Sequence, residues 1–191
     1  MKNIFVQGDF NNYRTARLDK AREPILEHSQ FAQRTTTVFI SHKHDDLADL
    51  EGIIGFLEQQ YGVKVYIDSR DPSMPQKTSG ETASKIKKRI EFCDKFILLA
   101  TNGAIDSKWC NWELGYGDAH KYQENIALFP MQPKGSSYTG NEYMEIYPYI
   151  VERSYGDTYS DGSAIKPGYY VRTKKQDGSY SITPLREWLK K

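Results

Sequence analysis

Short apolar runs that alternate with helical patterns constrain the fold of this chain more than any other feature. The run TTTVFIS at 35–41 is rich in β-branched and aromatic residues, as is typical of a buried strand. Further runs of this kind lie at 63–68, 95–101 and 125–131, and a fifth candidate lies around 145–152. Strands that alternate with helices form parallel sheets covered on both faces. The sequence therefore predicts an α/β fold, a flavodoxin-like doubly wound parallel sheet of about five strands.

The segments on either side of this pattern differ from it. Residues 1–34 are polar and weakly patterned, so we expect a partly helical N-terminal extension before the α/β domain at 35–152. Residues 153–191 carry the turn signal Asp177-Gly178 between two β-rich runs, followed by a short helical stretch. They predict an appendage made of a β-hairpin and a helix.

Composition narrows the class of protein. The chain has 191 residues, and its 26 Lys and Arg nearly balance its 25 Asp and Glu. That balance gives no electrostatic case for binding nucleic acid or an anionic membrane. The first residues are too polar for a signal peptide, and no apolar stretch approaches the length of a membrane span. The 2 cysteines have no metal-site spacing and suit a reducing cytoplasm. Together, these features lead us to expect a cytoplasmic protein with no nucleic-acid or membrane partner.

A glutamate lies among aromatic residues in the stretch SKWCNWELGYGD at 107–118. Wound as a helix at about 100° per residue, this stretch gathers its aromatic and apolar side chains on one broad arc. Glu113 lands near the middle of that arc rather than on the polar side. Burying an unpaired charge is costly, so a carboxylate there must be paired, protonated or functional.

Other polar residues follow the predicted strands at their carboxyl ends, where open α/β sheets form their sites. The first strand runs into Ser41-His42-Lys43 and the second ends at Asp68. The helix that carries Glu113 begins shortly after the third strand, near Ser107, and we expect its first turns to overlook the same crevice. The cluster HKHDD at 42–46 offers metal ligands, but such clusters at strand ends are usually loop polarity, so we expect no metal site.

Three of these stretches together carry a family resemblance. TTVFISHKHDD, VYIDSRD and SKWCNWEL resemble the corresponding segments of TIR (Toll/interleukin-1 receptor) domains over roughly residues 36–132. The helix motif S-x-W-C-x-x-E-L is especially similar to TIR domains that cleave NAD. A short TIR protein with a C-terminal extension also resembles the TIR component of the Thoeris anti-phage systems.

The resemblance implies that Glu113 is the catalytic glutamate and that NAD is the substrate, with no separate cofactor and no metal. The candidate substrate-binding residues are Phe39, Ser41, His42, Lys43, Asp68, Ser107 and Trp109. The resemblance also implies that the loop at 69–80 mediates TIR–TIR contacts between subunits. A separate effector would then sense an ADP-ribose-derived product, either cyclic or open.

The chemistry of this reaction suits a single carboxylate. Ordinary glycosides typically use two carboxyl groups. The nicotinamide of NAD leaves as a neutral ring from a cationic one, so no general acid has to protonate it. One carboxylate close to the developing oxocarbenium ion can supply most of the electrostatic stabilisation. What then attacks the ribose carbon stays open between hydrolysis, cyclisation and transfer to another acceptor.

Structural roles compete with several of these assignments. Trp109 suits packing of the helix as well as substrate stacking, Ser107 suits an N-cap as well as a ligand contact, and Asp68 suits a loop cap.

Two other functions also compete. A TIR adaptor that acts only by assembly with other TIR domains needs no carboxylate on this helix. A receiver domain phosphorylated on aspartate requires acidic residues directly after the first strand and an aspartate on the third strand. The first strand instead runs into Ser41-His42-Lys43 and the third ends in Thr101-Asn102, which argues against a receiver domain.

Overall fold

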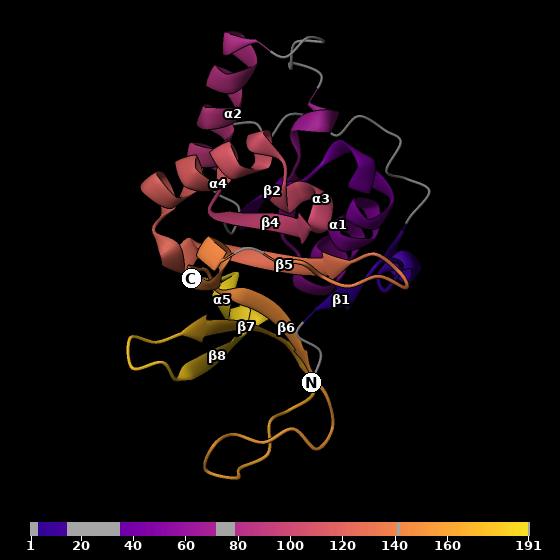
Figure 1. The fold of residues 1–191 in the computed structure, drawn as a ribbon, viewed down its shortest axis with the longest axis vertical. Coiled ribbons are helices and arrows are strands. Elements are labelled where there is room, and N and C mark those ends of the chain that lie inside the picture. The colour runs from indigo at the N-terminus through magenta and orange to yellow at the C-terminus, as the bar shows by residue number, and fades with distance from the viewer. Residues whose placement is uncertain (1–3, 15–34, 72–78, 141, 191) are drawn as a thin grey trace.

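The structure, a computed structural model, describes residues 4–14, 35–71, 79–140 and 142–190. Within these ranges one sheet has the strand order β3-β2-β4-β5-β6-β7-β8, and β1 pairs with β5 beside this path (Figure 1). The strands are β1 Phe5–Val6, β2 Thr37–Ser41, β3 Lys64–Tyr66, β4 Lys95–Thr101, β5 Ile126–Gln132, β6 Tyr149–Arg153, β7 Gly168–Lys174 and β8 Tyr180–Pro184.

The strands from β2 to β6 pair in parallel in the order β3-β2-β4-β5-β6. This order is the flavodoxin-like one, in which the chain first moves outward to one edge and then returns past its starting strand. The predicted doubly wound parallel sheet is therefore confirmed. The helices are α1 Leu47–Tyr61, α2 Gly80–Phe92, α3 Asn102–Ile105, α4 Lys108–Lys121 and α5 Leu185–Trp188.

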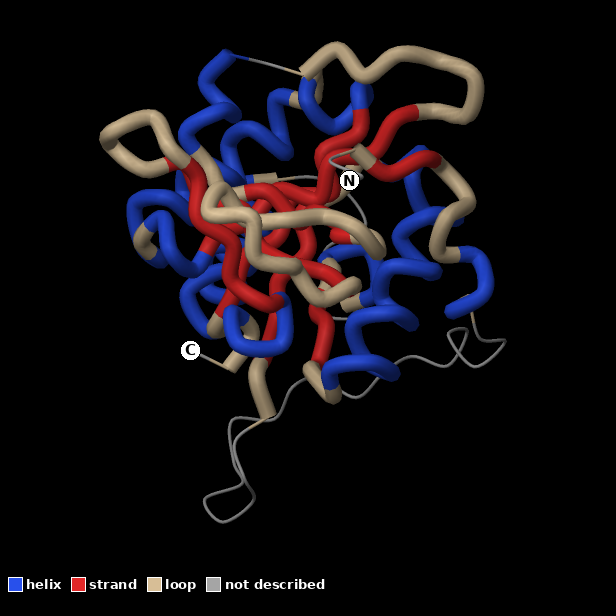
Figure 2. Tube along the Cα trace, turned by 90° about the horizontal axis from the view of Figure 1, so that it is seen from below, coloured by secondary structure: helices blue, strands red, loops and turns tan. Residues whose placement is uncertain are grey.

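Helices cover both faces of the parallel part, and Figure 2 shows the strands lying between them. On one face, α1 buries a row of apolar residues that includes Ile53 and Leu57. On the other face, α2 and α4 bury side chains such as Ile86, Ile90 and Leu114. The central strands β2, β4 and β5 are buried on both sides, as expected for a covered parallel sheet, whereas β3 at the edge is partly exposed.

The predicted hairpin and helix are also confirmed, and the hairpin extends the main sheet. β7 pairs antiparallel with β6, and β8 pairs antiparallel with β7. Gly178 has a φ of +80° in the turn between β7 and β8, a conformation that favours glycine. After the hairpin, α5 packs Leu185 and Trp188 into the same core as α1.

The first described residues also contribute to this core. β1 pairs in parallel with the end of β5, and both Phe5 and Phe10 are buried. Gly52 on α1 makes this possible, because a Cβ atom there would lie 2.6 Å from the Phe10 carbonyl oxygen. A single 3-10 turn spans Asn11–Tyr13, whereas residues 15–34, where most of the expected partly helical extension falls, lie outside the described residues. The predicted domain limits after residues 34 and 152 stay predictions.

No helix among the described residues combines the length and the apolar character that crossing a membrane requires. Cys93 and Cys110 are free thiols, and both are buried.

Candidate active site

Helix α4 presents Glu113 to the interior. Ser107 is the N-cap of the helix, and its Oγ accepts a hydrogen bond of 3.3 Å from the Cys110 amide. Gly117 lies one turn beyond Glu113, where a Cβ atom would come within 3.2 Å of the Phe96 ring. Glycine at this position allows α4 to approach β4 closely. The helix therefore holds the Glu113 side chain against the sheet, where it is only 2% exposed.

The carboxyl group of Glu113 receives hydrogen bonds at the carboxyl end of β2. The Ser41 hydroxyl, itself buried, donates a hydrogen bond of 2.5 Å to Glu113 Oε2. Burial raises the pKa of Glu113 to about 8, against the effect of the hydrogen bonds from Ser41 and Trp109, and the charge of Asp68 adds to the rise. No cation among the described residues offsets this burial. The site therefore holds a carboxyl group that is ready to ionise when a positive charge comes close.

His42 and Asp68 lie together beside this carboxyl group. His42 Nε2 lies 3.2 Å from Ser69 Oγ, and His42 Nδ1 lies 3.4 Å from the Ile40 carbonyl oxygen. Asp68 Oδ1 is 3.9 Å from His42 Nδ1. Burial lowers the pKa of His42, and the negative charge of Asp68 opposes this shift. The imidazole is therefore held in place by loop residues that follow β3.

The Lys43 side chain contacts Asp45 and the start of α3. Its Nζ lies 3.2 Å from Asp45 Oδ2, and its aliphatic chain passes over Gly103, where a Cβ atom would come within 2.9 Å of Lys43 Cδ. The described ranges contain no group of three or more His, Cys, Asp or Glu side chains that could hold a metal ion.

Phe39 and Trp109 occupy different environments. Phe39 is 0% exposed and stacks between the rings of Tyr66 and Phe96, with centroid distances of 5.7 and 5.5 Å. It therefore packs beneath the site and does not reach its surface. Trp109 is half-buried, and its ring lies 5.0 Å from that of Trp112.

The structure thus brings Ser41, Trp109 and Asp68 around Glu113, with His42 beside Asp68. It gives Ser107 the N-cap role, one of the two roles considered for it. Contact of any of these residues with a substrate stays a prediction.

Asp46 is a site residue that the sequence reasoning did not single out. It is buried, and its Oδ2 accepts a hydrogen bond of 2.6 Å from Thr101 Oγ1, which also accepts one from the Ala104 amide. These bonds tie the start of α1 to the end of β4 and the start of α3. Asp46 could have been identified in the sequence from its position directly before a predicted helix, where acidic residues are favoured.

Comparison with known proteins bears on this site. A family model described as TIR domain matches residues 38–151. The chain is 31% identical over 119 residues to a Bacillus cereus (strain MSX-D12) protein named probable 3′ cyclic ADP-D-ribose synthase ThsB′. That match covers 60% of this chain and 60% of its relative, so it spans less than two thirds of the relative's length.

A crystal structure of a prokaryotic SEFIR domain also matches, with 14% identity and a TM-score of 0.43, over 66% of this chain and 84% of that one. The TIR model covers more than half of the chain and includes Ser41, Asp68 and Glu113. The predicted family is confirmed: this chain belongs to the TIR domain family.

Proposed function

We propose that this protein cleaves the nicotinamide–ribose bond of NAD and makes a cyclic ADP-ribose-derived signal in bacterial anti-phage defence. The observation that carries the proposal is the buried Glu113 carboxyl group, which has hydrogen-bond donors but no cation among its described neighbours. The nicotinamide ring of NAD carries a positive charge that would favour the ionised carboxylate. The name of the ThsB′ relative supports a cyclic product.

The bond-breaking step assigns a role to each neighbouring group. The electrons of the bond between nicotinamide and ribose pass to the ring, which leaves neutral, and the ribose carbon becomes an oxocarbenium ion. The Glu113 carboxylate stabilises this ion, while Ser41 fixes the orientation of the carboxylate through the hydrogen bond of 2.5 Å. Because Glu113 is almost closed from solvent, substrate has to displace the side chains that cover it.

Capture of the oxocarbenium ion decides the product. In this closed environment, a hydroxyl or adenine nitrogen of the same molecule competes with water. Attack by a hydroxyl forms a new bond to the ribose carbon and releases one proton, which gives a cyclic isomer. Attack by water gives ADP-ribose instead. A separate effector would then sense the cyclic product.

Mass analysis of the reaction tests this proposal. We expect the purified protein to release nicotinamide from NAD together with a product lighter than ADP-ribose by one water. We expect the same product in phage-infected cells that carry the protein. If ADP-ribose and nicotinamide are the only products in both, the signalling role is wrong and a simple NAD-depleting enzyme remains. If no nicotinamide is released, the adaptor function is favoured.

Self-association is the second part of the proposal. The loop at 69–80, which by resemblance mediates TIR–TIR contacts, falls largely on residues 72–78, outside the described residues. We expect NAD cleavage per molecule to rise with protein concentration, because a neighbouring subunit completes the pocket. A dilution series with light scattering at each concentration measures this. A protein that stays monomeric throughout, with constant activity per molecule, would contradict it.

A further inference from the structure

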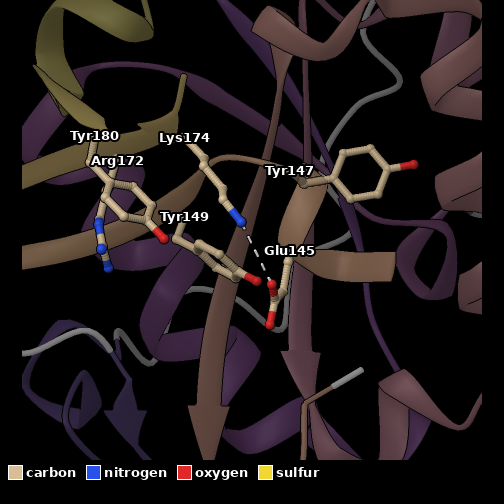
Figure 3. Close-up of a pocket in the computed structure, with 6 residues that line it drawn as sticks. All are labelled: Glu145, Tyr147, Tyr149, Arg172, Lys174 and Tyr180. Atoms are coloured by element: carbon tan, nitrogen blue, oxygen red, sulfur yellow. Dashed lines mark ion pairs between the residues drawn. The ribbon is translucent and has the colours of Figure 1, made fainter. Parts of the chain in front are cut away.

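A groove distinct from the Glu113 site lies on the C-terminal part of the sheet. A cavity of about 180 Å³ is lined by Glu145, Tyr147, Tyr149, Arg172, Lys174 and Tyr180 (Figure 3). A second cavity of about 510 Å³ shares Glu145 and Tyr149 with it and extends to Tyr138. Glu113 lines neither of them. We call the two cavities together the hairpin groove.

Strand register explains why these side chains converge. Arg172 and Lys174 are two positions apart on β7 and therefore point to the same face of the sheet. Tyr149 on β6 is directly opposite Arg172, and Tyr180 on β8 is directly opposite Lys174. Cross-strand pairs of this kind place their side chains next to each other. The face therefore alternates cationic and aromatic groups across three strands.

The Arg172 side chain lies over the ring of Tyr180. Its guanidinium carbon lies 3.6 Å from the centroid of the Tyr180 ring, and Figure 3 shows the side chain along that ring rather than directed at Glu145. A guanidinium stacked in this way keeps its N–H edge available for two parallel hydrogen bonds to a phosphate.

Lys174 has only a weak competing partner. Its Nζ lies 3.9 Å from Glu145 Oε2, and the two side chains are 46% and 70% exposed. Exposed pairs of this kind contribute little, so Lys174 can exchange Glu145 for a ligand anion at small cost.

A buried cation adds to the positive charge on this face. Arg153 follows Tyr149 and Val151 on the same side of β6 and is 6% exposed. Its Nε and Nη1 atoms have no hydrogen-bond partner in the part of the chain that the structure describes. Burial lowers the pKa of Arg153, Asp157 opposes this shift, and the charge of Arg172 adds to it. An anion bound near Arg172 would reduce the repulsion between these two arginines.

We propose that the hairpin groove binds a nucleotide, with its phosphate on Arg172 and Lys174 and its base against the ring of Tyr149. Arg172 and Lys174 alone would bind any small anion. The tyrosines and the adjoining larger cavity add an aromatic surface and room for a base and a sugar.

Calorimetry on the full chain with AMP, adenosine and inorganic phosphate tests the proposal. We expect AMP to bind at least about tenfold more tightly than either adenosine or phosphate, because it uses both parts of the groove. Arg172→Gln and Lys174→Gln should each weaken AMP binding by about tenfold. Lys175→Gln is the matched control, because Lys175 is exposed on the same hairpin and does not line the groove.

AMP binding that is unchanged in Lys174→Gln and Arg172→Gln would overturn the site. Phosphate binding as tight as AMP binding would overturn the nucleotide assignment. Lys174 is half-exposed, so its variant tests the site even if Arg172→Gln fails to fold. The result is independent of the proposed NAD cleavage, since Lys174→Gln should release nicotinamide from NAD at the unchanged rate.

Discussion

Glu113→Gln should lower NAD cleavage by at least about a hundredfold. Glutamine keeps the shape of the side chain and can still accept the hydrogen bond from Ser41, but it carries no charge to stabilise the oxocarbenium ion. The helix should persist, because glutamine is nearly as good a helix former as glutamate. Nicotinamide release measures the effect, and circular dichroism shows whether the variant is folded.

Glu124→Gln is the matched control for this change. Glu124 is exposed, and it lies after α4 rather than on its buried face. We expect Glu124→Gln to cleave NAD at the rate of the unchanged protein. A folded Glu113→Gln variant that also keeps this rate would show that the carboxylate has no catalytic role.

NAD cleavage should rise by about tenfold per pH unit on the acid side of pH 8 and level off above it. The reason is the pKa of Glu113, which burial raises to about 8, so that only a minority of free enzyme carries the carboxylate at neutral pH. Measurement of kcat/KM reports this group in the free enzyme. A profile that is flat from pH 6 to pH 9 would contradict the assignment of Glu113 as the ionising group.

Two variants locate the titration on Glu113. Ser41→Ala removes a hydrogen bond that lowers the pKa of Glu113, so the midpoint of the profile should move to higher pH.

The raised pKa of Glu113 also means that the folded state holds the proton of this carboxyl group more tightly than the unfolded chain does. Glu113 therefore destabilises the protein as pH rises from about 4.5 to about 8, and Glu113→Gln should not show this loss. Thermal unfolding of both proteins across this range measures the difference.

The environment of Glu113 was partly predictable because it depends on local periodicity. Helical spacing alone places this residue on the apolar arc, and the structure buries it there. The strand-end rule placed Ser41 in the same crevice, but not as the hydrogen-bond donor to Glu113. That contact depends on the distance between α4 and β2, which the small residue Gly117 helps to set through its packing on Phe96.

Other features depend on partners that are distant in the sequence. Phe39 and Ser41 are two positions apart and share a face of β2, but Phe39 stacks between Tyr66 and Phe96 whereas Ser41 donates a hydrogen bond to Glu113. β1 has two residues, too few for any periodicity, and its partner Met131 lies in β5. The hairpin groove likewise forms only once β6, β7 and β8 are in register.

The core beside α1 has a consequence for how this protein is made in the cell. Phe5 and Trp188 belong to that one core, although they lie near opposite ends of the sequence. Phe5 leaves the ribosome long before Trp188, so the core that they share stays incomplete until the last part of the chain has been synthesised. The strands that pair with β5 are synthesised before α5, but the core beside α1 cannot be completed until α5 has followed them. A nascent chain released before Trp188 would expose part of this core and become a substrate for chaperones and proteases.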